Sequence, residues 1–98
     1  MKNLIVNINK IFESRIRLGI MSALMVNDTI DFNSLKELLE LTDGNLASHL
    51  KALEQNEIIV VSKQFVGRKP NTTYAVTAKG REQFQQHLDA LENLVNNK

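Results

Sequence analysis

The chain has 98 residues, a formal net charge of +1 and 43% hydrophobic residues, and it contains no cysteine. This length predicts one domain over residues 1–98, because two separate cores would each be too small to be stable. The lack of cysteine excludes disulfides, thiolate metal ligands and cysteine nucleophiles, and no apolar run reaches the roughly 18 residues that a membrane span needs. We therefore expect a cytoplasmic protein that does not bind membranes.

The N-terminal part of the sequence predicts two helical segments. Asn7 and Ser14 are residue types that cap helices, so we expect a short segment over 8–13 and a longer helix from Ser14 to about Val26. A helix that is apolar on more than one side is buried on more than one side. This favours contact with a second subunit as well as with the chain's own core, and a central helix in a monomer is the alternative. The apolar residues are Ile16, Ile20, Ala23 and Leu24 on one side, and Leu18, Met21 and Met25 on another.

A short strand and a second helix are expected next. The segment from Thr29 to Phe32 alternates polar and apolar residues, as a strand does. Asn33 or Ser34 is the expected cap of a helix over 35–41, whose leucines face inward and whose charged residues face outward.

A third helix is expected from about Gly44 to Asn56, with Thr42 or Asp43 as its cap. Its leucines are spaced at i, i+4 and i+7, which gives a narrow stripe that packs on the first two helices. Small and polar residues occupy the rest of its first two turns. A helix whose N-terminal end enters the major groove of DNA needs such residues there. The stripe consists of Leu46, Leu50 and Leu53.

A basic hairpin follows the third helix. Residues 58–65 and 72–76 have strand patterns, and the turn residues 66–71 between them include the adjacent cations Arg68 and Lys69. Such a hairpin can lay its cations along phosphates or in the minor groove, while an ordinary solvated hairpin is the alternative. Residues 42–81 hold six basic and three acidic side chains, so the positive excess lies on this helix and hairpin.

The last predicted helix begins after Thr77 as its cap and has an apolar stripe with no obvious partner inside a three-helix core. We expect it both to fold back on the first helix and to pair with its copy in a dimer, so that residues 1–26 and 78–98 form the dimer surface. His87 flanks the stripe and is expected at the interface or on the surface. The expected interface residues are Leu4, Ile8, Ile11, Phe84, Leu88, Leu91, Leu94 and Val95.

With these elements in order, the chain resembles winged-helix transcriptional regulators of the MarR and ArsR types, and it is most similar to a small single-domain bacterial group. The resemblance covers about residues 14–85. It implies an α+β, mostly helical fold, with a three-helix core, a wing sheet of two to three strands and a C-terminal dimerisation helix. The motifs that match are Thr42-x-Gly44-Asn45-Leu46-x-Ser48-His49-Leu50 and Gly67-Arg68-x-Pro70-x-Thr72-x-Tyr74-x-x-Thr77-x-x-Gly80-Arg81.

The resemblance implies a homodimer that binds double-stranded DNA at a pseudo-palindromic operator. A recognition helix of about residues 44–56 would enter the major groove, and a wing of residues 65–72 would contact phosphates or the minor groove. Gly44 lies at the helix N-terminus, whose N–H groups can hold a phosphate, and Asp43 is interpreted as a cap. The base-reading candidates are Asn45, Ser48 and His49, and the phosphate or minor-groove candidates are Lys51, Lys63, Arg68, Lys69, Asn71 and Thr72.

Other functions have less support in the sequence. There is no arrangement of nucleophile and base, no paired acid–base carboxylates and no glycine-rich phosphate loop, so no enzyme is expected. Two histidines without cysteine do not support a metal-sensing site, and no cofactor is expected. The near-neutral net charge and the surplus apolar stripes favour one alternative, a winged-helix module that binds a protein partner without specific DNA binding. The sequence does not indicate whether a small-molecule effector exists.

Overall fold

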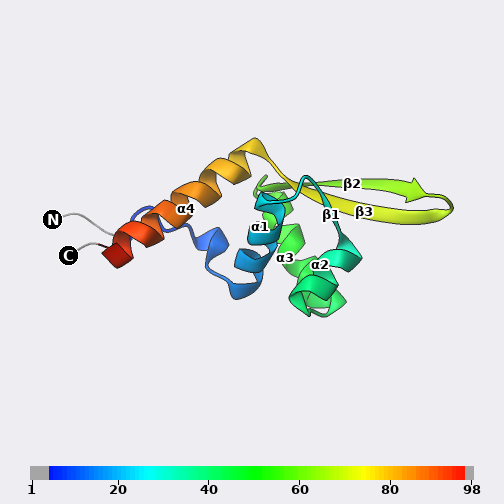
Figure 1. The fold of residues 1–98 in the computed structure, drawn as a ribbon, viewed down its shortest axis with the longest axis horizontal. Helices are drawn as coiled ribbons and strands as arrows, with labels where there is room; N and C mark the ends of the chain where they lie inside the picture. The colour runs from blue at the N-terminus through cyan, green and yellow to red at the C-terminus, as the bar shows by residue number, and fades with distance from the viewer. Residues whose placement is uncertain (1–4, 97–98) are drawn as a thin grey trace.

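A computed structural model describes residues 5–96, so the expected interface residue Leu4 lies outside the described residues. Figure 1 shows the helices α1, α2 and α3 gathered at the centre, with the β2–β3 hairpin extending from one end and α4 from the other, along a long axis of 59 Å. No helix of residues 5–96 is long and apolar enough to cross a membrane. In chain order the elements are the 3-10 turn η1 (Lys10–Phe12), α1 (Arg15–Met25), β1 (Ile30–Asp31), α2 (Phe32–Leu39), α3 (Asp43–Gln55), β2 (Ile59–Val66), β3 (Lys69–Val76) and α4 (Ala78–Asn96).

The core lies where α1, α2 and α3 meet the base of the sheet. The leucine stripe of α3 is fully or almost fully buried, which confirms the expected spacing. Aliphatic side chains build most of this core, and a T-shaped contact between Phe12 and Phe84 extends it toward α4. The other buried members are Ile20, Met21, Ala23 and Leu24 of α1, Leu35 of α2, and Ile58 and Ile59 where the sheet begins.

Ser14 and Thr42 are confirmed as helix caps, whereas the expected cap of α2 was wrong. Ser14 and Thr42 each accept a backbone N–H three residues on, from Arg17 and Asn45, at 3.2 Å. The cap of α2 is Asp31 and neither Asn33 nor Ser34, because the Asp31 carboxylate accepts the Ser34 N–H at 2.7 Å. This bond also lowers the pKa of Asp31. The helix therefore begins earlier than predicted, and β1 stops before residue 32.

The turn between α2 and α3 has a specific backbone conformation. Glu40 adopts the left-handed region, with φ at 53°, and its N–H bonds back to carbonyls of the last helical turn. The next N–H, that of Leu41, also bonds to a carbonyl of that turn at 3.1 Å. These bonds satisfy carbonyls that a helix end leaves without partners, so α2 ends at residue 39 and not at 41 as expected.

The sheet has three antiparallel strands in the order β1-β3-β2, and Ile30 of β1 lies opposite Tyr74 of β3. The hairpin turn is only Gly67-Arg68, because Val66 already pairs with Lys69. The predicted loop over 66–71 was therefore too long. Gly67 has φ at +66°, and glycine at the first central position is the residue that a two-residue type II′ hairpin turn requires.

The N-terminal segment packs along α4. The predicted helical segment over 8–13 is only the turn η1, which Asn9 caps in place of Asn7. The Asn9 N–H donates to Nδ1 of His87 at 3.0 Å, and the imidazole packs beside Phe12 with ring centroids 5.3 Å apart. His87 is 2% exposed, so the expectation that it lies at the surface or an interface was wrong. Its ring supplies an acceptor for a backbone N–H that burial would otherwise leave unsatisfied.

Thr77 caps α4 as expected, because its Oγ1 accepts the Gly80 N–H at 2.9 Å. The same hydroxyl lies 2.7 Å from the Glu57 carbonyl oxygen, to which it donates. One turn into the helix, Gly80 lies directly against the backbone of Ile58, which leaves no room for a side chain. This contact brings α4 against the base of the hairpin.

Replacing Gly80 with Ala should destabilise the fold by about 3 kcal/mol, since the new Cβ would overlap the carbonyl oxygen of Ile58 and overpacking against backbone is not relieved by side-chain rotation. Gly44→Ala is the matched control, because a Cβ there meets nothing within 4 Å. That helical substitution should be neutral or stabilising by up to about 1 kcal/mol. Chemical denaturation of both variants measures the difference, and equal stability would contradict the packing.

Acidification from about pH 7 to about pH 5 should lower stability through the histidines. Burial lowers the pKa of His87, although the charge of Glu13 opposes this, and burial and the charge of Arg17 lower the pKa of His49. Below the ordinary value of 6.5 the unfolded chain then binds more protons than the folded chain. The contribution of the two histidines to the free energy of unfolding is fully present above this pH. It is lost as the pH falls toward their pKa values in the folded chain, by at most about 1.4 kcal/mol per pH unit for each proton.

Denaturation of His87→Gln at several pH values checks this expectation, because the variant should lose most of the pH dependence in that range. His49→Gln is the comparison and should lose a smaller part, since His49 is only half-buried. Asp31 titrates below this range, so it does not obscure the result. An unchanged pH dependence in His87→Gln would contradict the buried, neutral imidazole.

Candidate nucleic-acid interface

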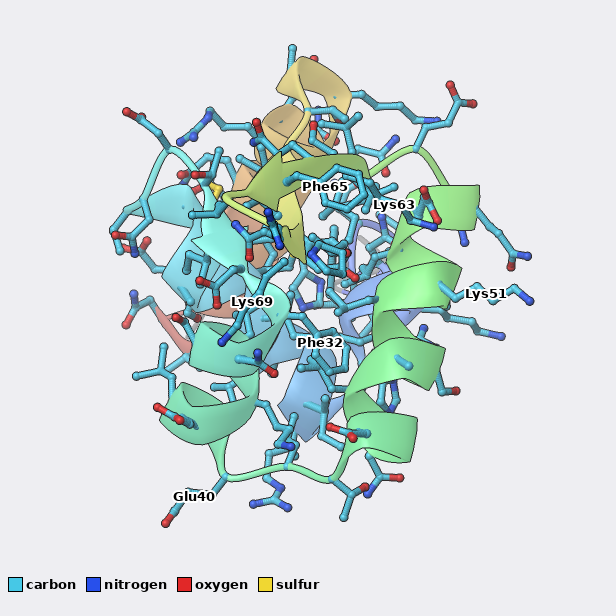
Figure 2. The ribbon with its side chains drawn as sticks, turned by 90° about the vertical axis from the view of Figure 1, so that its right-hand side faces the viewer. Phe32, Glu40, Lys51, Lys63, Phe65 and Lys69 are labelled. Carbon is cyan, nitrogen blue, oxygen red and sulfur yellow. The ribbon has the colours of Figure 1, made fainter. Side chains whose placement is uncertain are left out.

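The side of α3 that faces away from the core is open to solvent. Gly44, Asn45, Ser48 and Lys51 are all exposed, and Figure 2 shows the Lys51 side chain pointing away from the body of the molecule. Small or polar groups at the start of the helix leave its backbone accessible. A positive side chain follows in the next turn. This surface can approach a groove of a duplex without a steric obstacle from apolar side chains.

The start of α3 is tied to α2 by an ion pair. Asp43 is the first residue of the helix and not its cap, and its carboxylate lies 2.8 Å from Nζ of Lys36. A carboxylate in the first helical turn is favourable because of the partial positive charge there. The pair is exposed, so its contribution to stability is small. Its consequence at this surface is that Lys36 offsets the negative charge of Asp43.

His49 differs from the other base-reading candidates because it is half-buried and hydrogen-bonded inside the protein. Its Nδ1 accepts from Nε of Arg17 at 3.0 Å, and Nη1 of Arg17 also donates to the Ile11 carbonyl at 3.3 Å. Burial lowers the pKa of His49, and the nearby guanidinium lowers it further. The sequence did not indicate the contact between Arg17 and His49, because no local pattern connects residues on different helices.

The hairpin presents cations on both of its sides. Lys63, Arg68 and Lys69 are exposed, whereas Asn71 and Thr72 are half-buried. Figure 2 looks along the hairpin toward the core and shows Lys63 on the side of α3 and Lys69 on the side of α2. Lys63 pairs with Thr72 and Lys69 pairs with Val66, and side chains alternate along each strand, so Lys63 and Lys69 lie on opposite faces of the hairpin. The hairpin therefore offers positive charge at its tip and on both faces.

Phe65 is a feature of the hairpin that the sequence did not single out as a site residue. Its side chain is 74% exposed, that of the neighbouring Val66 is 65% exposed, and Figure 2 shows Phe65 beside Lys63. Phe65 and Val66 are adjacent in the strand and lie on opposite faces, so they form no continuous apolar patch, and Phe65 is a single exposed aromatic side chain available for contact. The signal available was an aromatic residue near the end of the predicted strand, two residues after Lys63 and three before Arg68.

The expected dimer residues fall into three groups. Leu88, Leu94 and Val95 are exposed on α4, with Val95 the most open at 81%. Leu88 and Val95 are two helical turns apart and so lie on one side of the helix. Ile8, Ile11 and Leu91 are half-buried, and Phe84 is 2% exposed because Phe12 covers it within the same chain.

No metal site is formed in the described part of the chain, where no three His, Cys, Asp or Glu side chains lie close enough together to hold an ion.

Comparison with known proteins identifies the family. The model of the winged helix DNA-binding domain, a family of DNA-binding domains and not of enzymes, matches residues 16–95. An uncharacterized protein of Methanocaldococcus jannaschii is 38% identical over 88 residues, which are 90% of this chain and 96% of that protein.

Solved structures agree with this family. A transcriptional regulator homologue from Pyrococcus horikoshii OT3 is 30% identical, with a TM-score of 0.77 over 92% of this chain and 94% of that chain. A protein described as a MarR-family regulator from Enterococcus faecalis V583 shares the fold at 22% identity, with a TM-score of 0.67 over 94% and 76% of the chains. The expected bacterial grouping stays a prediction. The chain belongs to the winged helix DNA-binding domain family, and its structural neighbours are MarR-family and related transcriptional regulators.

Proposed function

We propose that residues 1–98 act as one domain that binds double-stranded DNA sequence-specifically as a homodimer and regulates transcription. In this proposal α3 enters the major groove and the hairpin contacts phosphates or the minor groove. The similarity to the Pyrococcus horikoshii protein, whose description is transcriptional regulator homologue, supports the regulatory role. The family match supports DNA as the ligand.

The observation that carries this proposal is the pairing of two surfaces on one rigid core. The open face of α3 offers Asn45 and Ser48 as hydrogen-bonding groups, and the hairpin that follows it offers Lys63, Arg68 and Lys69 as exposed cations. Base contacts give sequence preference and phosphate contacts give affinity and register. The burial of the leucine stripe holds α3 so that its polar face stays outward.

The distribution of charge favours two copies on one site. The chain has a net charge of only +1, so a single copy has little overall electrostatic attraction to DNA. Figure 1 shows α4 at the opposite end of the molecule from the hairpin. Pairing through the exposed side of α4 would leave both α3 helices and both hairpins accessible. Two linked copies gain affinity because the second binding event becomes intramolecular.

Selection of duplexes from a random pool tests the proposal. The expected result is a pair of inverted half-sites whose centres are about 10 base pairs apart, or a multiple of that spacing. Recovery of one half-site would contradict the dimer. If the purified chain binds no duplex at low salt, the proposal of DNA binding is overturned. A stoichiometric protein partner whose binding persists at high salt would then support the alternative, a winged-helix module that binds a protein.

Removal of two cations from the hairpin, by Arg68→Ala with Lys69→Ala, should weaken binding to all sequences alike. Each lost phosphate contact reduces the slope of log K against log salt by about 0.9, so a dimer that loses four contacts should lose nearly 4 from the slope. Fluorescence anisotropy over a range of salt concentrations measures this slope.

The matched control removes the same charge away from the tip of the hairpin. Lys10→Ala with Lys79→Ala alters one residue on the N-terminal segment and one at the start of α4, both exposed. This variant should keep nearly the whole salt slope. Equal losses in the two double variants would show that only net charge matters, and would contradict a specific role of the hairpin.

Charged residues on the exposed side of α4, introduced as Leu88→Glu with Val95→Glu, should separate the dimer. Both side chains are exposed in the single chain, so the fold should remain intact. Loss of the linked second site should reduce DNA affinity by about 10²- to 10⁴-fold.

Sedimentation gives the mass of the particle in solution. The control is Gln86→Glu with Asn93→Glu, at exposed polar positions of the same helix. A wild-type chain that sediments at 11.1 kDa at micromolar concentration would contradict the dimer.

A further inference from the structure

The contact between Arg17 and His49 joins α1 to the helix proposed to read DNA. The bond from Arg17 Nε to His49 Nδ1 is 3.0 Å long and connects residues 32 positions apart in the sequence. The second bond of the guanidinium, to the Ile11 carbonyl, holds the arginine from the side of the N-terminal segment. Arg17 is half-buried, and two bonded partners on different segments restrict its side chain to one orientation.

The chemistry of the two groups determines where the imidazole proton lies. A guanidinium has only donors and stays protonated in proteins, so the Nδ1 atom of His49 must act as an acceptor without a proton. A neutral imidazole then carries its hydrogen on Nε2. Burial and the charge of Arg17 both disfavour a second proton, because they lower the pKa of His49. The ring is thus held as a single tautomer.

The Nε2 side of the ring is open. Within residues 5–96 no hydrogen bond from Nε2 is formed, and no buried side-chain nitrogen or oxygen there lacks a partner. The Nε2 atom is therefore accessible to solvent. His49 follows the exposed Ser48 on the same helix, at the edge of the open face of α3.

We propose that Arg17 is a positioning residue that fixes His49 as an Nε2–H donor, so that His49 reads a base through an acceptor on its major-groove edge. The acceptors available are N7 and O6 of guanine, N7 of adenine and O4 of thymine, whereas cytosine presents its N4 amino donor. His49 therefore selects against cytosine at the base that it faces. This inference rests on the proposed function. It adds Arg17, which lies on α1 and outside the recognition helix α3, to the residues that determine base specificity.

Two competing roles of Arg17 make different predictions. A phosphate contact by Arg17 would give weaker binding to every sequence after its removal, and the salt slope would fall. A purely structural role would lower stability without changing base preference. A positioning role changes the preference at one base pair and acts only through His49, so the effects of removing Arg17 and His49 should not add.

The DNA test uses Arg17→Met, which removes the donors but keeps a long side chain, with Arg15→Met as the matched control. Arg15 is exposed, lies two residues away on α1 and carries the same charge. Affinities are measured for operators that differ at each base pair of the half-site in turn. The wild-type chain should disfavour cytosine at one position by about five- to tenfold. Arg17→Met and His49→Ala should each abolish this preference, the two together should do no more, and Arg15→Met should retain it.

Arg17→Lys supplies the rescue, because lysine is also a donor without an acceptor and should restore part of the preference. A spectroscopic measurement tests the same contact without DNA. Nitrogen chemical shifts of the wild-type imidazole should show Nδ1 unprotonated and Nε2 protonated, and Arg17→Met should shift the ring toward a mixture of tautomers. The wild-type measurement tests the inference even if Arg17→Met does not fold, because a protonated Nδ1 of His49 in the wild-type chain would overturn it.

The outcomes separate this inference from the function on which it rests. If the wild-type chain binds no duplex, the proposed function fails and base reading by His49 fails with it. If the wild-type chain binds an operator and Arg17→Met keeps every base preference, or loses affinity uniformly, only the positioning role is overturned.

Discussion

Burial of the leucine stripe of α3 is the constraint on which the rest of the structure depends. The same helix must present Leu46, Leu50 and Leu53 to the core and polar groups to the outside, and with 3.6 residues per turn it can do both only if the two sets are kept on separate faces. The core thereby fixes the rotation of the helix about its axis. The direction in which Asn45 and Ser48 face follows from hydrophobic packing and not from any contact of their own.

The edges of this helix show how the surrounding elements refine its position. The Lys36–Asp43 pair ties its start to α2, and Arg17 ties its flank to α1 and to the N-terminal segment. Both contacts involve side chains that are partly exposed, so their contribution to stability is modest. Their importance lies in orientation, because they hold groups at a surface where a small displacement changes which hydrogen bonds can form.

Most features that depend on neighbours in sequence could be predicted, and features that depend on distant residues could not. The caps Ser14, Thr42 and Thr77 bond to groups within three residues, so composition and spacing indicated them. The periodicity of the apolar residues likewise predicted the buried stripe, and the resemblance to winged-helix regulators implied the fold. The cap of α2 was missed because Asp31, Asn33 and Ser34 are all suitable residue types, and only the bond from Ser34 to Asp31 decides among them. His87 was placed at the surface because its partner, the N–H of Asn9, is 78 residues away. The Arg17–His49 bond has no sequence signature for the same reason.

The two-residue turn at Gly67-Arg68 has a consequence for how the hairpin can vary in length. A two-residue turn cannot take up or release a residue without breaking the strand pairing. A longer or shorter hairpin therefore requires one residue added to or removed from each strand, which changes its length by about 3.4 Å. One residue inserted into a single strand would move every side chain between that point and the turn to the opposite face. Lys63 and Phe65 would then exchange sides with Ser62 and Gln64. The reach of the hairpin therefore changes by whole residue pairs. One residue added to each strand keeps the pairing register, and two added to each strand also keep every side chain on its original face.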